Sequence, residues 1–362
     1  MENNAAATNF FLGTTTAAGF FGCFSQLQTQ EGLHLYLLKG APGCGKSTLL
    51  RRLCARAGQP VQCIHCCSDP ASLDGVIFSA QKAAVLDATP PHSVEPAAPG
   101  AGETVISLYD ALNEDYLRPR QLEITAWAVK GKELRRQAAR YVGSAAGLLS
   151  DNRRIAAGCA DFVRVRRYVH RLAGRLIPRE NAHGTEQVRF VSGITPDGMI
   201  FYKDTLSALA KTLYVFHDNY GAVSRLAMEL LRQEALCRGQ RVITCRCALH
   251  PESKIDHLLL PDLGLGFLTS NPWHPCHFAG QKNIHCARFL DLVHLRGARC
   301  RLRYHQAAAD RLLAQAIEAM AQARTSHQAL EALYAPAVNF AVINAQTEAC
   351  AARLWPGSEP EK

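Results

Sequence analysis

The chain lacks the features that would place it in a membrane or mark it for export. No stretch approaches the run of roughly 20 apolar residues that a helix needs to cross a bilayer. The N-terminus begins Met1-Glu2-Asn3-Asn4 and has no basic region ahead of an apolar one, so it does not have the pattern of a secretory signal. We therefore expect a cytoplasmic protein that has no membrane partner.

A closed zinc pattern is also missing, although the sequence contains 14 cysteines. Ligand-type residues gather in Cys63-Ile64-His65-Cys66-Cys67 and in His274-Pro275-Cys276-His277, but their spacing matches no closed zinc site. The first group is expected along a strand, whose side chains alternate between two faces and would not converge on one ion. We expect these cysteines to be free thiols that fill the core of a protein in a reducing compartment.

The chain repeats itself. Residues 9–110 and 189–291 share a pattern of matching residues in the same order, at offsets between 178 and 182 that change only through small gaps. The pairs include Gly13 with Gly193, Leu35-Tyr36 with Leu213-Tyr214, Gly43 with Gly221, Cys66 with Cys247, Asp74 with Asp256 and His92 with His274. Because chance similarity would not keep this order, we infer an internal duplication.

The strongest motif is Gly40-Ala41-Pro42-Gly43-Cys44-Gly45-Lys46-Ser47, followed by Thr48. An apolar strand is expected before it and a helix after it, which is the setting in which glycines let backbone N–H groups cradle phosphates. Lys46 would reach the β- and γ-phosphates and Ser47 would ligate Mg²⁺. The sequence therefore predicts a binding site for a nucleoside triphosphate with magnesium.

A second predicted strand ends in an acid, Asp87, which has the form of the carboxylate that holds the magnesium shell. Because another strand is expected between the loop and this acid in sequence, we expect a strand inserted between the two in the sheet. Asp87 is followed by Ala88 and not by a glutamate, so another group must orient the attacking water. Asp69 and Asp74 are the nearest candidates.

The second copy has lost this chemistry. At the equivalent positions Gly40 is Asp218, Lys46 is Ser224, Ser47 is Arg225 and Asp87 is Thr269. We infer that the second copy no longer binds magnesium and a triphosphate. Asp69 becomes His250, whereas Asp74 is kept as Asp256, so we expect a catalytic or magnesium role for Asp69 and a structural one, such as a helix cap, for Asp74.

Each copy reads as an α/β unit followed by helices. The expected elements of the first are strands at Leu33–Lys39, Val61–Cys66, Ala83–Leu86 and Thr104–Leu108, a helix at Lys46–Ala57 and a loop at 90–102. The Ala-, Leu- and Arg-rich segments 113–180 and 296–354 are expected to form long antiparallel helices that project from each unit. The resulting division is 1–112, 113–185, 186–295, 296–355 and a disordered tail at 356–362.

The segment 113–180 is basic, with 15 Arg and Lys against 7 Asp and Glu. It could form a surface for nucleic acid or another polyanion, or supply an arginine to the nucleotide site. It could also be a solvated helix face whose arginine stems pack on apolar neighbours.

The strand–GAPGCGKST–helix segment resembles the P-loop NTPase superfamily. Over its whole length the chain resembles a bacterial group of tandem P-loop proteins labelled only as ATPases, through the Gly13–Gly19 segment, His65-Cys66-Cys67-Ser68-Asp69-Pro70 with Leu73-Asp74-Gly75, and the repetition of this layout. The resemblance implies ATP binding and hydrolysis, with two duplicated P-loop NTPase-like α/β units. The chain departs from the group at Asp218, Ser224 and Arg225, where the second P-loop is degenerate.

Three hypotheses follow for the function. The first is an ATPase whose catalytic residues are Lys46, Asp87 and Asp69. The second is a small-molecule or nucleotide kinase that uses Asp69 as base, and the third is a non-catalytic, ATP-dependent scaffold that binds nucleic acid. The guanine-reading motif Asn/Thr-Lys-x-Asp does not follow the loop, which favours ATP over GTP without deciding between them.

Overall fold

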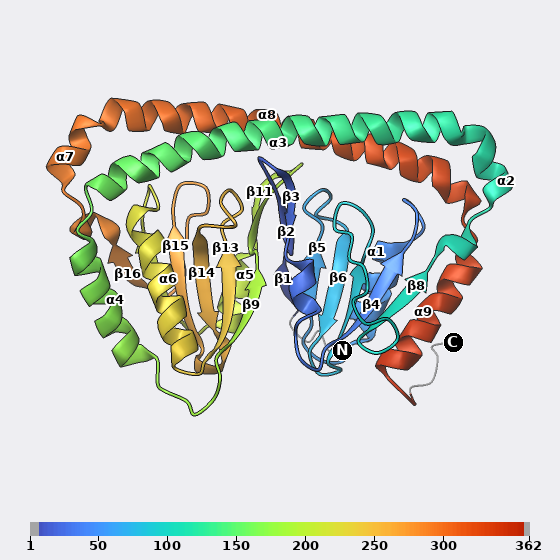
Figure 1. Ribbon diagram of the computed structural model, residues 1–362, viewed down its shortest axis with the longest axis horizontal. Coiled ribbons are helices and arrows are strands. Elements are labelled where there is room, and N and C mark those ends of the chain that lie inside the picture. Colours follow the sequence, from blue (N-terminus) through green and yellow to red (C-terminus); the bar gives the residue numbers. More distant parts are fainter. Residues whose placement is uncertain (1–6, 358–362) are drawn as a thin grey trace.

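The computed structural model describes residues 7–357 and consists of two α/β units that lie side by side beneath a pair of long helices (Figure 1). Each unit contains one six-stranded mixed sheet and a separate two-stranded hairpin. The duplication inferred from the sequence is therefore visible as two similar units with the same order of elements.

The first sheet has the order β1-β5-β6-β7-β4-β8, in which β6 runs antiparallel to both neighbours and the other pairs are parallel. Its strands are β1 (Thr8–Phe10), β4 (His34–Lys39), β5 (Gln62–His65), β6 (Leu73–Phe78), β7 (Ala83–Asp87) and β8 (Glu103–Ser107). The hairpin is β2 (Gly13–Thr16) with β3 (Gly19–Gly22), the short 3₁₀ helix η1 covers Phe24–Leu27, and helix α1 covers Lys46–Arg56.

The second sheet repeats this arrangement in the order β9-β13-β14-β15-β12-β16. Its strands are β9 (Thr185–Arg189), β12 (Thr212–His217), β13 (Arg241–Arg246), β14 (Ile255–Leu260), β15 (Leu265–Ser270) and β16 (Lys282–His285). The hairpin is β10 (Ser192–Thr195) with β11 (Gly198–Phe201), and the helices are α5 (Lys203–Leu209) and α6 (Ala222–Cys237).

The prediction of a strand inserted between the loop strand and the acid strand is wrong. Strand β4 pairs directly with β7, with Leu38 opposite Asp87. Two strands separate them in sequence, β5 and β6, and both lie on the far side of β7. Strand β5 is the strand expected at Val61–Cys66, whereas β6 was not predicted at all. Asp74 and Gly75 are poor strand formers, but every residue of β6 is buried between its neighbours and the layers that cover the sheet.

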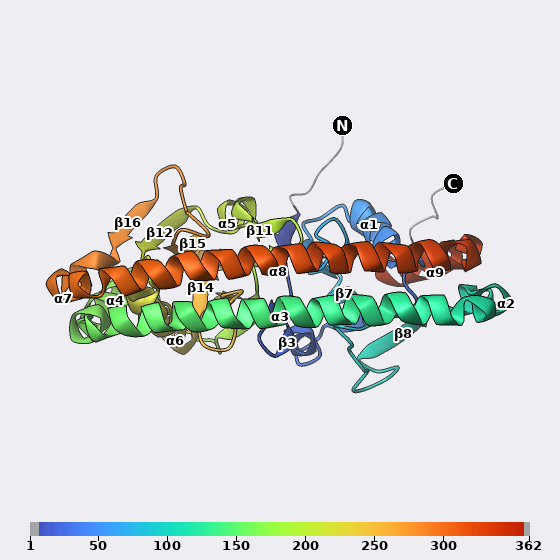
Figure 2. The ribbon, with the colours of Figure 1, turned by 90° about the horizontal axis from the view of Figure 1, so that it is seen from above.

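The helical segments cross from one unit to the other and do not project from the unit that precedes them. Helix α3 (Gln121–Gly158) starts beside the first unit and ends beside the second, and α8 (Arg299–Tyr334) runs back antiparallel along it (Figure 2). The antiparallel partner of each long helix therefore belongs to the other segment. Helix α4 (Phe162–Leu176) then packs on α6 of the second unit, and α9 (Phe340–Leu354) packs on α1 of the first. The short helices α2 (Glu114–Leu117) and α7 (Leu292–Gly297) lead into the long ones.

Two equivalent backbone bridges hold the helical segments where they meet the units. Leu112 and Val338 form an isolated bridge at the end of the first unit, and Ala160 and Leu290 form its counterpart at the end of the second. Leu290 and Val338 are the residues 178 positions after Leu112 and Ala160, and α9 follows α4 by 178 positions at both of its ends. The duplication thus continues through the helices at one constant offset.

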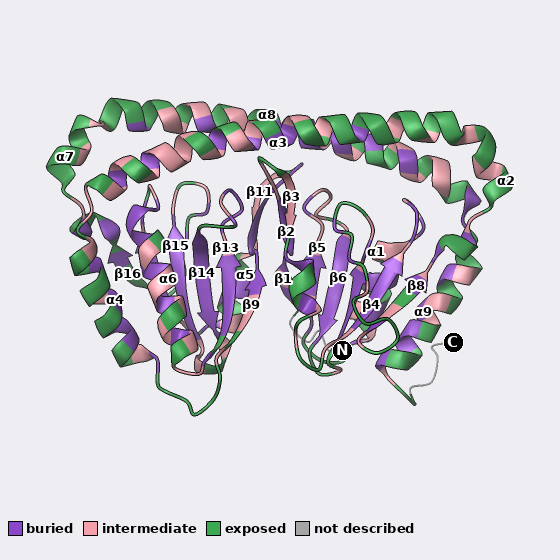
Figure 3. Ribbon diagram, in the orientation of Figure 1, coloured by how far each residue is buried: buried purple, intermediate pink, exposed green. Residues whose placement is uncertain are grey.

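The two units meet through equivalent residues that directly follow β1 and β9. The backbone N–H of Phe11 donates to Phe190 O at 2.8 Å, and Phe190 N–H donates back to Phe11 O at 2.9 Å. Both phenylalanines are fully buried and belong to a core cluster that spans the two units. The central strands of each sheet are buried on both faces, while the outward sides of the long helices are exposed (Figure 3).

The 14 cysteines all lie in the described part of the chain, are free thiols and are mostly buried, as expected for core fillers. Among residues 7–357 no group of three or more His, Cys, Asp or Glu side chains forms a metal cage. In the same range no helix is long and apolar enough to cross a membrane. Of the tail expected to be disordered, residues 358–362 lie outside the described part.

Candidate nucleotide site and its counterpart in the second unit

The phosphate loop lies between the end of β4 and the start of α1, as the motif requires. Gly45 is the N-cap of α1 with φ +82°, and Gly43 has φ +71°, a backbone region that side chains with a Cβ rarely adopt. A Cβ on Gly40 would lie 2.7 Å from Cys44 Sγ. The three glycines are therefore required by the conformation of this loop.

Lys46 and Asp87 lie together at the mouth of the loop. Lys46 Nζ donates to Gly40 O at 3.0 Å and to Ala41 O at 2.9 Å, and lies 3.7 Å from Asp87 Oδ2. Thr89 holds the other carboxylate oxygen of Asp87, through its hydroxyl at 2.6 Å and its backbone N–H at 3.0 Å. The cation and the acid that the sequence assigned to one site are thus brought together and oriented.

Ser47 lies in the first turn of α1, where its Oγ accepts a hydrogen bond from Leu73 N–H at 3.0 Å. The next residue, Thr48, has an exposed side chain. A serine hydroxyl and the Asp87 carboxylate are hard oxygen donors of the kind that Mg²⁺ binds together with phosphate oxygens and water. The residues present therefore fit the magnesium ion that the motif implies.

Asp69 follows β5 and lies partly exposed at the side of the site. Its Oδ2 accepts from Ser72 Oγ at 2.7 Å, and its Oδ1 lies 4.0 Å from Arg324 Nη1 of α8. Arg324 is a partner that the sequence did not indicate.

Asp74 is not a helix cap, because it lies within β6 and is buried. Its Oδ1 lies 3.4 Å from His92 Nε2, and the equivalent residues Asp256 and His274 lie 3.3 Å apart in the second unit. A pair kept in both units is what a structural role predicts. Burial raises the pKa of Asp74 to about 6, opposed by His92 and reinforced by Asp87.

The C-terminal part of α8 covers the loop. A Cβ on Gly43 would lie 2.9 Å from the backbone oxygen of Glu331, so the last turn of α8 packs directly on the loop. His327 lies one turn earlier, with Nε2 3.7 Å from Glu331 Oε1. Burial lowers the pKa of His327, and the charge of Lys46 contributes to this lowering. Helix α9 adds Ile343, whose Cγ2 lies 3.8 Å from the Cβ position of Gly45.

The equivalent loop of the second unit holds its own carboxylate. Asp218 is buried, and its Oδ2 accepts from Val223 N–H at 2.9 Å and from Ser224 N–H at 2.8 Å. Its Oδ1 accepts from Gly221 N–H at 3.0 Å and from Tyr220 N–H at 3.3 Å. These are the amides that would cradle a phosphate, so an anion could bind them only by displacing Asp218.

The other polar side chains of the second site also pair with one another. Lys254 is buried and pairs with Asp256, and Thr269, at the position of Asp87, donates its hydroxyl to the same carboxylate at 3.5 Å. The long helices cover this site as they cover the first, because Arg153 of α3 and Gln306 of α8 line the pocket above the loop.

Comparison of the chain with protein-family models, with curated proteins and with solved structures finds no match in any of the three. The functional argument therefore depends on the geometry of the two sites and on the motif.

Proposed function

We propose that the protein is an ATPase whose first unit binds and hydrolyses Mg-ATP, while its second unit no longer binds a triphosphate. The observation that carries this proposal is the contrast between the two loops. In the first, Lys46 and Asp87 face each other at the mouth of the glycine loop, 3.7 Å apart. In the second, the Asp218 carboxylate accepts hydrogen bonds from the amides of the cradle.

Different residues of the first unit would have different roles in phosphoryl transfer to water. The loop amides and the α1 N-terminus would bind the phosphates, and Lys46 would bind the terminal ones. Ser47 and Asp87 would hold Mg²⁺, which neutralises charge on the phosphates when bound. Asp69, oriented by Ser72, would accept a proton from the attacking water.

The decisive experiment replaces Lys46. In Lys46→Ala, ATP affinity should fall about 10- to 100-fold because a charge-assisted contact to phosphate is lost. Phosphate release should fall at least as far. The matched control is Ser224→Ala, which alters the equivalent position of the second unit and should leave both quantities unchanged. Unchanged ATP affinity in Lys46→Ala would disprove the proposal.

The same assay separates hydrolysis from the alternatives. Phosphate release from ATP alone supports an ATPase, whereas turnover that needs an added acceptor supports the kinase. Tight binding without turnover supports the scaffold. Parallel measurements with GTP test the choice of base.

We also propose nucleic acid as a partner, on the basis of a charge difference between the repeats. Helix α4 carries Arg164, Arg167 and Arg171 on its exposed side, where the equivalent positions of α9 are Val342, Ala345 and Ala349. Because α9 packs on α1 as α4 packs on α6, the fold does not require these arginines.

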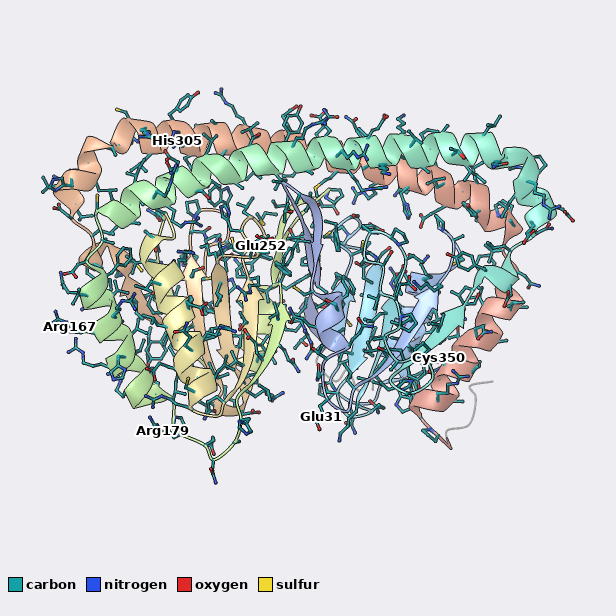
Figure 4. All side chains as sticks on the ribbon, viewed as in Figure 1. Glu31, Arg167, Arg179, Glu252, His305 and Cys350 are labelled. Atoms are coloured by element: carbon teal, nitrogen blue, oxygen red, sulfur yellow. The ribbon has the colours of Figure 1, made fainter. Side chains whose placement is uncertain are left out.

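More exposed arginines gather at the same end of the molecule (Figures 1 and 4), where the side chains of Arg167 and Arg179 point outward. They are Arg166, Arg175, Arg179, Arg288, Arg296, Arg299 and Arg303, together with Arg301, which pairs with Asp151. Guanidinium groups form paired hydrogen bonds with phosphate oxygens, which suits a nucleic-acid backbone.

The test is fluorescence anisotropy with labelled RNA and DNA at several salt concentrations. The variant Arg164→Ala/Arg167→Ala/Arg171→Ala should bind at least 10-fold more weakly and with a smaller salt slope. Arg353→Ala, at the opposite end of the molecule, is the control. Binding to anionic vesicles but not to RNA or DNA would assign this surface to a membrane instead.

A further inference from the structure

One face of α8 presents ionisable side chains to the nucleotide site. Arg324, His327 and Glu331 are spaced three and four residues apart, which places them on the same side of a helix. Arg324 lies 4.0 Å from Asp69, and Glu331 packs on Gly43. This face therefore reaches from the phosphate loop to the candidate proton acceptor.

Arg324 also contacts the second unit. Its Nη2 lies 2.8 Å from Asp197 Oδ1, and its Nη1 donates to Asp197 Oδ2 at 2.9 Å. Asp197 lies in the turn between β10 and β11, whose hairpin reaches toward the long helices (Figure 1). A single guanidinium thus connects a carboxylate of the first unit with one of the second.

The equivalent face of α3, which lies over the second unit, has apolar residues at two of these positions. At the constant offset of 178 through the helices, Arg324 corresponds to Ala146 and His327 to Leu149. Asp197 corresponds to Ala18, in a turn with the same hydrogen bond from a threonine hydroxyl, Thr16 to Gly19 O and Thr195 to Gly198 O.

The differences between the two units bear on whether Arg324 serves the packing of the helices or the nucleotide site. Helices α3 and α8 pack along each other over both units, with arginine at this position of α8 and alanine at the equivalent position of α3. The arginine and its aspartate are present together only on the side that keeps Lys46, Ser47 and Asp87. An ion pair that only joined the two units would also be kept or lost as a pair, so the contact of Arg324 with Asp69 is what connects this pair to the nucleotide site.

We propose that Arg324 is a positioning residue of the ATP site, which orients Asp69 toward the water that attacks the γ-phosphate and links that site to Asp197 of the second unit. This inference rests on the proposed ATPase function. In the reaction, the water oxygen bonds to the γ-phosphorus while the bond from that phosphorus to the β,γ-bridging oxygen breaks, leaving its electron pair on ADP. Asp69 takes the water proton and later releases it to solvent. Ser72 holds one oxygen of Asp69 by a hydrogen bond, and the Arg324 guanidinium, 4.0 Å from the other oxygen, would attract it electrostatically and so favour one orientation of the carboxylate.

The test measures ATP affinity, kcat and KM for Arg324→Ala, Arg324→Lys and Asp197→Ala in the full-length protein. Arg324→Ala should lower kcat about 10- to 100-fold, because small displacements of a catalytic group have effects of this size, and should leave ATP affinity nearly unchanged. Arg324→Lys should recover part of the loss. Asp197→Ala should keep kcat within about threefold of wild type, since Arg324 can still pair with Asp69. Arg311→Ala, an exposed arginine elsewhere on α8, is the control.

The outcomes separate the possible explanations. If Asp197→Ala loses as much activity as Arg324→Ala, with the same fall in Tm, Arg324 is only a structural link between the units and the inference is overturned. It is equally overturned if wild type hydrolyses ATP and Arg324→Ala matches Arg311→Ala. If wild type neither binds nor hydrolyses ATP, it is the proposed function that fails.

Discussion

The Asp218 carboxylate accepts a hydrogen bond from the backbone N–H of Ser224 at 2.8 Å, within the loop that corresponds to the phosphate loop of the first unit. Ser224 occupies the position of Lys46, and Asp218 occupies that of Gly40. The residue that replaces a glycine thus supplies a carboxylate to the amides that, in the proposed site of the first unit, would bind an anion. Helix α6 starts directly after its N-cap residue, Gly221, so the amides of Val223 and Ser224 that donate to Asp218 belong to the first turn of the helix.

Asp218→Ala should therefore destabilise the second unit. The loss of the hydrogen bonds from the loop and from the first turn of α6 should cost about 1–2 kcal/mol, measured as a lower urea midpoint. Asn219→Ala, an exposed neighbour in the same loop, should change the midpoint little. If Asp218→Ala were as stable as wild type, the carboxylate would not be satisfying the loop amides. Inorganic phosphate should stabilise Asp218→Ala more than wild type, because the amides are then free to bind an anion.

Gly43→Ala should uncouple the loop from α8. The new Cβ would lie 2.9 Å from the Glu331 carbonyl oxygen on a backbone with φ +71°, so both the loop and the last turn of α8 must shift. We expect weaker ATP binding and faster amide exchange around residues 328–334.

The matched variant is Gly221→Ala, with φ +70° in the second unit, where the new Cβ would meet the Lys254 side chain at 3.0 Å and no backbone atom of the long helices. Gly221→Ala should lower the stability of the protein as Gly43→Ala does, but it should leave ATP affinity unchanged. Loss of ATP binding in both variants would show a general effect on folding.

Much of the α/β framework was predictable from the sequence, because it depends on local patterns. Strand β4, the glycine loop and α1 form where an apolar run, glycines and a good helix former follow one another. Strand β6 was missed because Asp74 and Gly75 disfavour a strand, and only burial on both faces stabilises it. Helix α4 packs on α6 and helix α9 packs on α1 because each reaches that apolar surface in the folded chain. The periodicity of a helix shows which face is apolar but not which surface that face will contact.

The candidate site was predictable only in part, for a similar reason. Lys46, Ser47 and Asp87 belong to motifs with fixed spacing, and the structure places Lys46 beside Asp87. Arg324 and His327 lie more than 230 residues further along the chain, on a helix whose composition shows no motif. The only signal in the sequence is the repeat itself: at the offset of 178, Arg324 and His327 correspond to the apolar residues Ala146 and Leu149.

Ile343→Ala should weaken ATP binding as well as folding. Ile343 of α9 is buried against the apolar face of α1 and lies 3.8 Å from the Cβ position of Gly45. Truncation should cost about 2–5 kcal/mol and loosen the support of the loop. Its equivalent on α4 is Val165, buried in the second unit. Val165→Ala should also destabilise the protein, yet ATP affinity, measured by calorimetry well below Tm, should change only in Ile343→Ala.

The buried carboxylates Asp74 and Asp256 should give the two units different responses to pH. Burial, reinforced by Asp87 and opposed by His92, raises the pKa of Asp74 from 3.8 to about 6. Between these two values the folded protein binds more protons than the unfolded chain, so the contribution of Asp74 to stability is largest at low pH. It is lost progressively as pH rises from about 4 to about 6 and then stays constant.

Asp74→Asn keeps an oxygen that can accept from His92 but does not titrate, so it should abolish this part of the pH dependence. Thermal unfolding at intervals from pH 4.5 to 7.5 should show that wild type loses stability relative to Asp74→Asn as pH rises toward 6. Asp256→Asn is the control: burial favours protonation of Asp256, but Lys254 and His274 outweigh it and hold its pKa well below the usual value. Asp256 is therefore ionised throughout the tested range, and the difference between wild type and Asp256→Asn should not vary with pH. If the Asp74→Asn curve ran parallel to that of wild type, Asp74 would not titrate near pH 6 in the folded protein.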